Sequence, residues 1–78
     1  MTPGFINSID HDRKRGYIKP SHGGELIPFD FDGLAEGEDP GELRIGARVY
    51  FDVEGGLAGI MATRVRRVAD RTPSELNT

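Results

Sequence analysis

The chain has 78 residues, a formal net charge of −3, 11 glycines, 5 prolines and no cysteine. This length allows one small domain, and the lack of cysteine excludes disulfides, thiolate metal ligands and thiol nucleophiles. No apolar run approaches the ~20 residues of a membrane span, and the first residues do not resemble a signal peptide. We therefore expect a soluble cytoplasmic protein with no membrane partner.

Short strands separated by turn residues are the expected elements, because no segment keeps the 3.6-residue period of an amphipathic helix. In chain order they are expected at residues 5–9, 15–19, 25–30, 47–54 and 58–68. Ile6 and Ile9 can both point inward only if a β-bulge lies between them. Pro28 removes a backbone donor, so the third strand should lie at an edge or be irregular there.

The second half of the chain gives the clearest strand signal. Val49, Phe51 and Val53 alternate with polar residues, which predicts one buried and one exposed face. An acidic, glycine-rich surface loop is expected before this strand at 31–43, and a Gly55-Gly56 turn after it. Five strands with one long connection are the plan of an OB-type barrel. We therefore expect an all-β, five-stranded OB-fold barrel over residues 1–68, followed by a flexible tail at 69–78.

Charge is distributed unevenly along the chain. Residues 1–24 carry four basic and two acidic side chains, a net of +2, and residues 56–78 carry the same numbers. Residues 25–55 carry nine acidic and two basic side chains, a net of −7. Two basic segments thus flank an acidic middle. The acidic loop would either repel phosphate or attract a basic protein partner.

The second and third strands are joined by a short connection, so their outward side chains should form one surface. With Ile18, Leu26 and Pro28 placed inward, the expected outer residues are Arg15, Tyr17, Lys19, Ile27 and Phe29, with Arg13 and Lys14 at the margin of this surface. Aromatic side chains among cations suit single-stranded nucleic acid, because bases stack on rings and cations hold phosphates. A one-residue shift of the third strand would instead bury Ile27 and Phe29 and expose Leu26.

Five segments in this order and spacing carry a resemblance to a known family. They are Gly-Phe-Ile-Asn-Ser-Ile-Asp at 4–10, Arg-Lys-Arg-Gly-Tyr-Ile-Lys-Pro at 13–20, Gly-Glu-Leu-Ile-Pro-Phe at 24–29, Leu-Arg-Ile-Gly-Ala-Arg-Val-Tyr-Phe at 43–51 and Gly-Leu-Ala-Gly-Ile-Met-Ala-Thr-Arg-Val at 56–65. Together they resemble the cold-shock domain of the bacterial cold-shock proteins. The resemblance implies an OB barrel that binds single-stranded RNA or DNA, as an RNA chaperone or a modulator of transcription or translation.

The chain departs from the family pattern mainly at the positions that stack on bases. The departures are Ser8 for a tryptophan, Lys14 for a glycine, Arg15 for an aromatic residue, Ile27 for a phenylalanine and Phe29 for a histidine. Tyr17 keeps the aromatic character of its position. Each lost stacking contact removes about 1–3 kcal/mol, so the resemblance implies weaker, more charge-dependent binding, with Arg15 stacking in part.

No residue cluster predicts an enzyme, a cofactor or a small-molecule substrate. The acidic residues that begin at Asp30 and Asp32 lack the spacing of a calcium loop, so no metal is expected. His11 and His22 lie in separate turns, without a paired carboxylate that can be placed, and are expected to face solvent.

Two interpretations remain open beside this one. The basic side chains of 64–67 either extend a phosphate path or solubilise the last strand, and the second is favoured because Arg64 and Arg66 share a face that Arg67 does not. The alternative function is that of a degenerate cold-shock domain. Such a domain would bind a basic protein through its apolar face and the acidic loop at 30–42.

Overall fold

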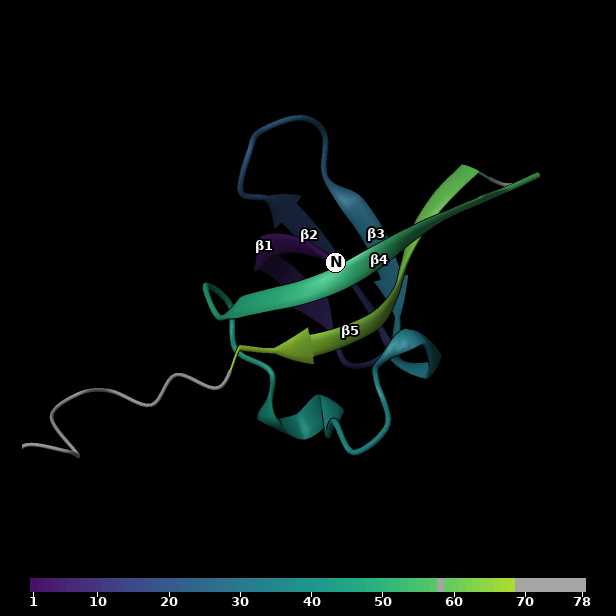
Figure 1. Ribbon diagram of the computed structural model, residues 1–78. Coiled ribbons are helices and arrows are strands. Elements are labelled where there is room, and N and C mark those ends of the chain that lie inside the picture. The colour runs from purple at the N-terminus through teal and green to yellow at the C-terminus, as the bar shows by residue number, and fades with distance from the viewer. Residues whose placement is uncertain (58, 69–78) are drawn as a thin grey trace, which may run out of the picture.

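The fold is known from a computed structural model, which describes residues 1–57 and 59–68. It is all-β, as predicted, with five strands in one antiparallel sheet (Figure 1). The strands are β1 (Thr2–Asp10), β2 (Arg15–Pro20), β3 (Ile27–Asp30), β4 (Arg48–Gly56) and β5 (Gly59–Arg67). Their order across the sheet is β3-β2-β1-β4-β5. The expected tail at 69–78 lies outside the described residues, and no helix within the described ranges is long and apolar enough to cross a membrane.

The two edge strands, β3 and β5, lie next to each other because the sheet curves strongly around its core. In the described residues they are not joined by a hydrogen-bonded ladder, so the sheet is not closed. The core is made of Ile6, Ile18, Phe29, Leu43, Val49, Phe51, Ala62 and Val65. All five strands contribute to it, and Leu43 comes from the connection between β3 and β4.

Two irregularities predicted for the first three strands are present. The register of β1 against β2 shifts between Ile6 and Ser8, which lets both Ile6 and Ile9 pack on the core. Pro28 lies on an edge strand, where a missing N–H leaves no gap inside the sheet. The third strand is shorter than predicted and begins at Ile27.

Residues 52–56 of β4 and their partners at 59–63 of β5 form a two-stranded arm. The pairing of β1 with β4 ends at Phe51, so residues 52–56 pair with β5 alone and extend beyond the rest of the sheet (Figure 1). The prediction that Val53 is buried was therefore wrong: it is 44% exposed, because no other layer covers the arm. The predicted Gly55-Gly56 turn was also wrong, since both glycines pair within the hairpin and the chain reverses after them.

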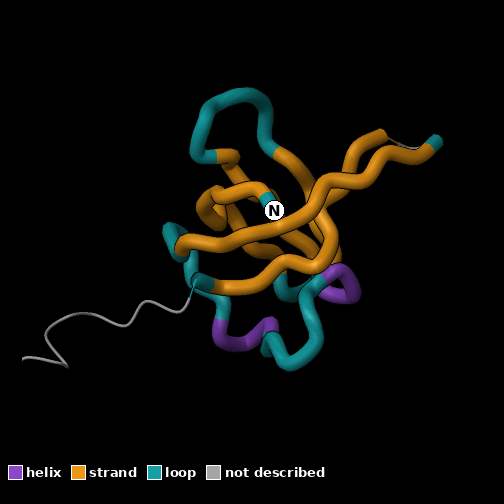
Figure 2. The backbone as a smooth tube through the Cα atoms, in the orientation of Figure 1, coloured by secondary structure: helices purple, strands orange, loops and turns teal. Residues whose placement is uncertain are grey.

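The acidic connection between β3 and β4 is predicted as an irregular loop but contains two 3₁₀ turns, Phe31–Gly33 and Pro40–Glu42. Both lie at one end of the sheet, below it in Figure 2. The Ala35 N–H donates to the carbonyl of Val65 over 2.8 Å, next to a parallel bridge between Leu34 and Val65. The connection is thereby held against β5.

Candidate functional site

The outer face of β2 has the arrangement predicted for it. Ile18 is buried, and Arg15, Tyr17 and Lys19 alternate with it on the exposed side. Tyr17 is 41% exposed, and Arg15 and Lys19 are its neighbours on the same face of the strand. A hollow of about 260 Å³ borders Tyr17 and Arg15 and is also lined by Ser8, Asp10 and Arg13. This part of the surface combines an exposed ring with two arginines, a hydroxyl group and one carboxylate.

The third strand presents the opposite face from the one predicted. Phe29, expected to stack on bases, is completely buried, Ile27 is half-buried against the core, and Leu26 is 42% exposed. The prediction took Leu26 as an inward residue of the third strand, but Leu26 precedes β3 and is exposed. Each residue of β3 was therefore assigned to the wrong face. The prediction of Phe29 as a binding residue was therefore wrong, and Ile27 contributes little to the outer surface.

Gly16 explains why Phe29 can be buried. The two residues are directly opposite each other in the β2–β3 ladder. A Cβ atom at position 16 would lie 2.8 Å from Cε1 of Phe29 and 2.5 Å from the carbonyl oxygen of Ser8. The ring fills the space that a side chain would otherwise occupy. A glycine opposite a large apolar residue was the sequence signal for the correct register.

The outward residues of β3 are Pro28 and Asp30, which the sequence interpretation did not include. Pro28 is opposite Tyr17, and Asp30 is opposite Arg15. The Nε of Arg15 lies 3.7 Å from Oδ1 of Asp30, with both side chains about half exposed. An acceptor carboxylate therefore lies inside the cationic surface.

The turn between β1 and β2 sets the position of the remaining cations. Oδ1 of Asp10 accepts hydrogen bonds from the N–H groups of Asp12 and Arg13, each over 3.1 Å. Lys14 then has a φ of 58°, a conformation that favours glycine. Its carbonyl accepts a 2.9 Å hydrogen bond from the N–H of Phe31. Arg13 and Lys14 are exposed at the margin of the face, as expected.

Phe31 is a second aromatic residue of this region that sequence reasoning missed. Its half-buried ring packs on the core and meets His11 edge-on, with 5.7 Å between the ring centroids. A hollow of about 270 Å³ lies against it and is also lined by Arg13, Lys14, Asp30 and Asp32. His11 and His22 are both exposed, as predicted.

Two of the three arginines of β5, Arg64 and Arg67, are paired with acidic side chains. Nε of Arg64 lies 2.6 Å from Oδ2 of Asp52, and Nε of Arg67 lies 3.1 Å from Oε1 of Glu38. The hydrogen bond from Arg64 lowers the pKa of Asp52 below its ordinary value and raises the pKa of Arg64. Arg64 and Arg67 are thus partly neutralised, whereas Arg66 forms no ion pair among the described residues, so the interpretation of this basic group stays a prediction.

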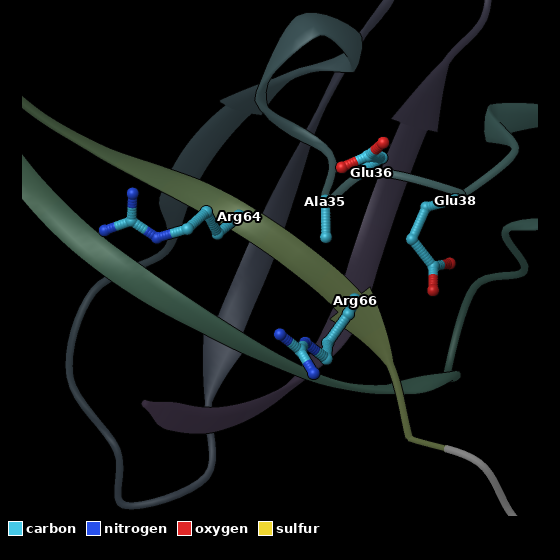
Figure 3. Close-up of a pocket in the computed structure, with 5 residues that line it drawn as sticks. All are labelled: Ala35, Glu36, Glu38, Arg64 and Arg66. Carbon is cyan, nitrogen blue, oxygen red and sulfur yellow. The ribbon is translucent and has the colours of Figure 1, made fainter.

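A shallow hollow of about 290 Å³ separates β5 from the acidic connection (Figure 3). It is lined by Glu36, Glu38, Arg64, Arg66 and Ala35, and the Arg64 side chain points away from the two glutamates. Because both signs of charge surround it, this hollow selects neither anions nor cations. Within residues 1–57 and 59–68, no three histidine or acidic side chains are grouped to hold a metal.

No protein-family model and no curated protein matches the chain.

Proposed function

We propose that this protein binds single-stranded RNA or DNA, and that its sheet is an OB-type barrel of the cold-shock kind. The observation that carries the proposal is the exposed ring of Tyr17 between Arg15 and Lys19 on the outer face of β2. Stacking on such a ring is available to every base, and flanking cations hold the phosphates on either side. The negative net charge of the whole chain comes from residues 25–55. Four of their acidic side chains, Glu38, Glu42, Asp52 and Glu54, lie beside Arg64 or Arg67 of β5 and not beside β2.

The strand arrangement supports the finer fold assignment. Five strands in the order β3-β2-β1-β4-β5, with edges that lie next to each other, are compatible with a small barrel. The long connection follows the third strand, as the OB plan requires.

Each side chain of the face has a distinct role in this proposal. Tyr17 stacks on one base, Arg15 stacks or contacts phosphate, and Lys14 and Lys19 neutralise the backbone. Phe31 takes the aromatic role that was predicted for Phe29. With only two rings, binding is weaker than on a full aromatic platform, and it depends on salt. Such binding suits an RNA chaperone, or a modulator of transcription or translation in the cytoplasm.

The test is a fluorescence anisotropy titration with U-rich RNA and T-rich DNA at low and at physiological salt. Tyr17→Ala is expected to weaken binding about 5- to 150-fold, the equivalent of one stacked base. Tyr50→Ala is the matched control, because Tyr50 on β4 is 39% exposed but lies two strands away. Equal affinities of both variants and the wild type would contradict the assignment of Tyr17.

A second candidate is a protein-binding function through the arm. Ile60 of β5 faces Leu26, Ile27 and Pro28 across a hollow of about 460 Å³, and exposed apolar side chains of this kind mark interaction sites. The acidic loop contributes less than expected to a basic partner, because Arg67 already pairs with Glu38 and Glu42. If no oligonucleotide binds even at low salt, this second function is favoured.

A further inference from the structure

The pair formed by Arg15 and Asp30 is an unusual feature for a nucleic-acid surface. The two residues are directly opposite in the β2–β3 ladder, and 3.7 Å separates Nε of Arg15 from Oδ1 of Asp30. A carboxylate repels phosphate, so its place inside a cationic face needs another explanation. The carboxylate of Asp30 is an acceptor and the guanidinium of Arg15 is a donor, so together they can form hydrogen bonds with the edge of a base.

The hollow beside this pair offers a place for that base. Phe31 forms one wall and is held by the 2.9 Å hydrogen bond from its N–H to the carbonyl of Lys14 and by the ring of His11. Asp30 lies at the side of the same hollow, and Arg13 and Lys14 lie at its rim. A ring, the two carboxylates of Asp30 and Asp32 and two cations therefore surround a space of about 270 Å³. Arg15 lies next to this hollow through its pair with Asp30.

Base chemistry decides which nucleotide fits this set of groups. The Watson–Crick edge of guanine presents two adjacent donors, N1–H and the N2 amino group, beside the acceptor O6. Uracil and thymine present one donor between two acceptors, and adenine and cytosine present a single amino donor. An ionised carboxylate only accepts hydrogen bonds, so it can form two with guanine and is repelled by the carbonyls of uracil.

We infer that Asp30 and Arg15 make this protein selective for guanine in single-stranded nucleic acid. This inference rests on the proposed function and adds a base preference to it. Guanine stacks on Phe31, donates N1–H and N2–H to the carboxylate of Asp30, and accepts at O6 from Arg15. The existing ion pair is long and exposed, and such pairs contribute little, so the base displaces it at small cost.

The test uses short U-rich oligonucleotides with one variable base, measured by anisotropy on the full chain. Guanine at this position is expected to bind about tenfold more tightly than uracil, in the range of one good bidentate contact. Inosine lacks the N2 amino group and should lose most of this gain. 7-Deazaguanine keeps the Watson–Crick edge and should bind as guanine does.

Asp30→Asn is nearly isosteric but replaces one acceptor oxygen by a donor, and it should abolish the preference for guanine over inosine. Asp12→Asn makes the same charge change on an exposed residue of the neighbouring β1–β2 turn that does not line the hollow, and this control should retain the preference. Equal binding of guanine and inosine by the wild type, or a preference that survives in Asp30→Asn, would overturn the inference. If all bases bind equally, the inference alone fails, whereas no binding of any oligonucleotide means that the proposed function fails with it.

Discussion

The two basic segments of this chain carry the same net charge in the sequence but differ in the folded protein. In the N-terminal segment, Arg13 and Arg15 each lie 3.7 Å from their carboxylate partners. In the C-terminal segment, Arg64 and Arg67 approach theirs to 2.6 and 3.1 Å, and each has a second acidic neighbour. Acidic side chains of residues 25–55 therefore approach Arg64 and Arg67 more closely than they approach Arg15 of β2. Equal net charge does not mean equal availability to a phosphate.

The arrangement of apolar groups differs between the two regions as well. The outer face of β2 lies directly on the core, because the Phe29 ring fills the space next to Gly16. In the arm formed by β4 and β5, Val53 and Ile60 have no layer above them.

The largest expected effect separates core from surface on neighbouring strands. Phe29→Ala should lower the free energy of unfolding by about 3–5 kcal/mol, because it leaves a cavity in the core. Tyr17→Ala should change the free energy of unfolding by no more than about 0.5 kcal/mol, since its ring is exposed. Urea denaturation followed by circular dichroism measures both. A similar small loss in the two variants would mean that Phe29 is not a core residue.

The next effect concerns the two non-glycine residues that have positive φ within 1–57 and 59–68, one in each region: Lys14 at 58° and Arg64 at 49°. Lys14→Gly should raise the free energy of unfolding by about 1 kcal/mol, because it removes the steric cost of the left-handed conformation. Arg64→Gly relieves the same cost but loses the pair with Asp52, so its gain should be smaller. Thermal unfolding of both variants measures these changes in stability. A Lys14→Gly variant less stable than the wild type would contradict the steric cost assigned to Lys14.

The salt dependence of oligonucleotide binding tests the difference in charge availability. Lys19→Gln should reduce the slope of log K against log salt by about 0.7, the value for one phosphate contact on a single strand. Arg67→Gln removes the same charge from the region whose cations are paired, and it should leave the slope unchanged. Equal slopes for the two variants would show that both regions, or neither, contact phosphate.

The smallest effect is a pH dependence of stability in the C-terminal region. The pKa of Asp52 is lowered in the folded protein by its hydrogen bond from Arg64, so the unfolded chain binds more protons there. The stabilisation is present above the ordinary carboxyl pKa of about 3.9 and is lost as the pH falls through the folded value. As the pH falls from about 5 to about 2, the free energy of unfolding of Asp52→Asn should therefore decrease less than that of the wild type. Parallel acid-unfolding curves would exclude this contribution.

Much of the fold could be predicted from local patterns. The spacing of Ile6 and Ile9 was enough to require a bulge in β1, and the alternation around Ile18 placed the outer face of β2. These features depend on residues that are close in sequence, and the burial of one residue fixes that of its neighbours.

The third strand and the arm could not be predicted in the same way. The four residues of β3 are too few for alternation to choose a register, and the choice was made by Gly16 on another strand. Val53 continues a clear pattern of period two, but its exposure depends on where β1 stops pairing with β4. Asp52 is 12 positions from Arg64, and Glu38 is 29 positions from Arg67. A local sequence pattern does not indicate contacts between residues so far apart in the chain.

The close approach of Phe29 to Gly16 also constrains how this surface can change over evolutionary time. Arg15 and Tyr17, the neighbours of Gly16, point to solvent, so packing does not restrict their replacement and only binding can. Position 16 cannot gain a side chain even if position 29 becomes small, because the backbone carbonyl of Ser8 would still lie 2.5 Å from the new Cβ atom. Related chains should therefore keep glycine at 16 for packing, whatever residues binding selects at 15 and 17.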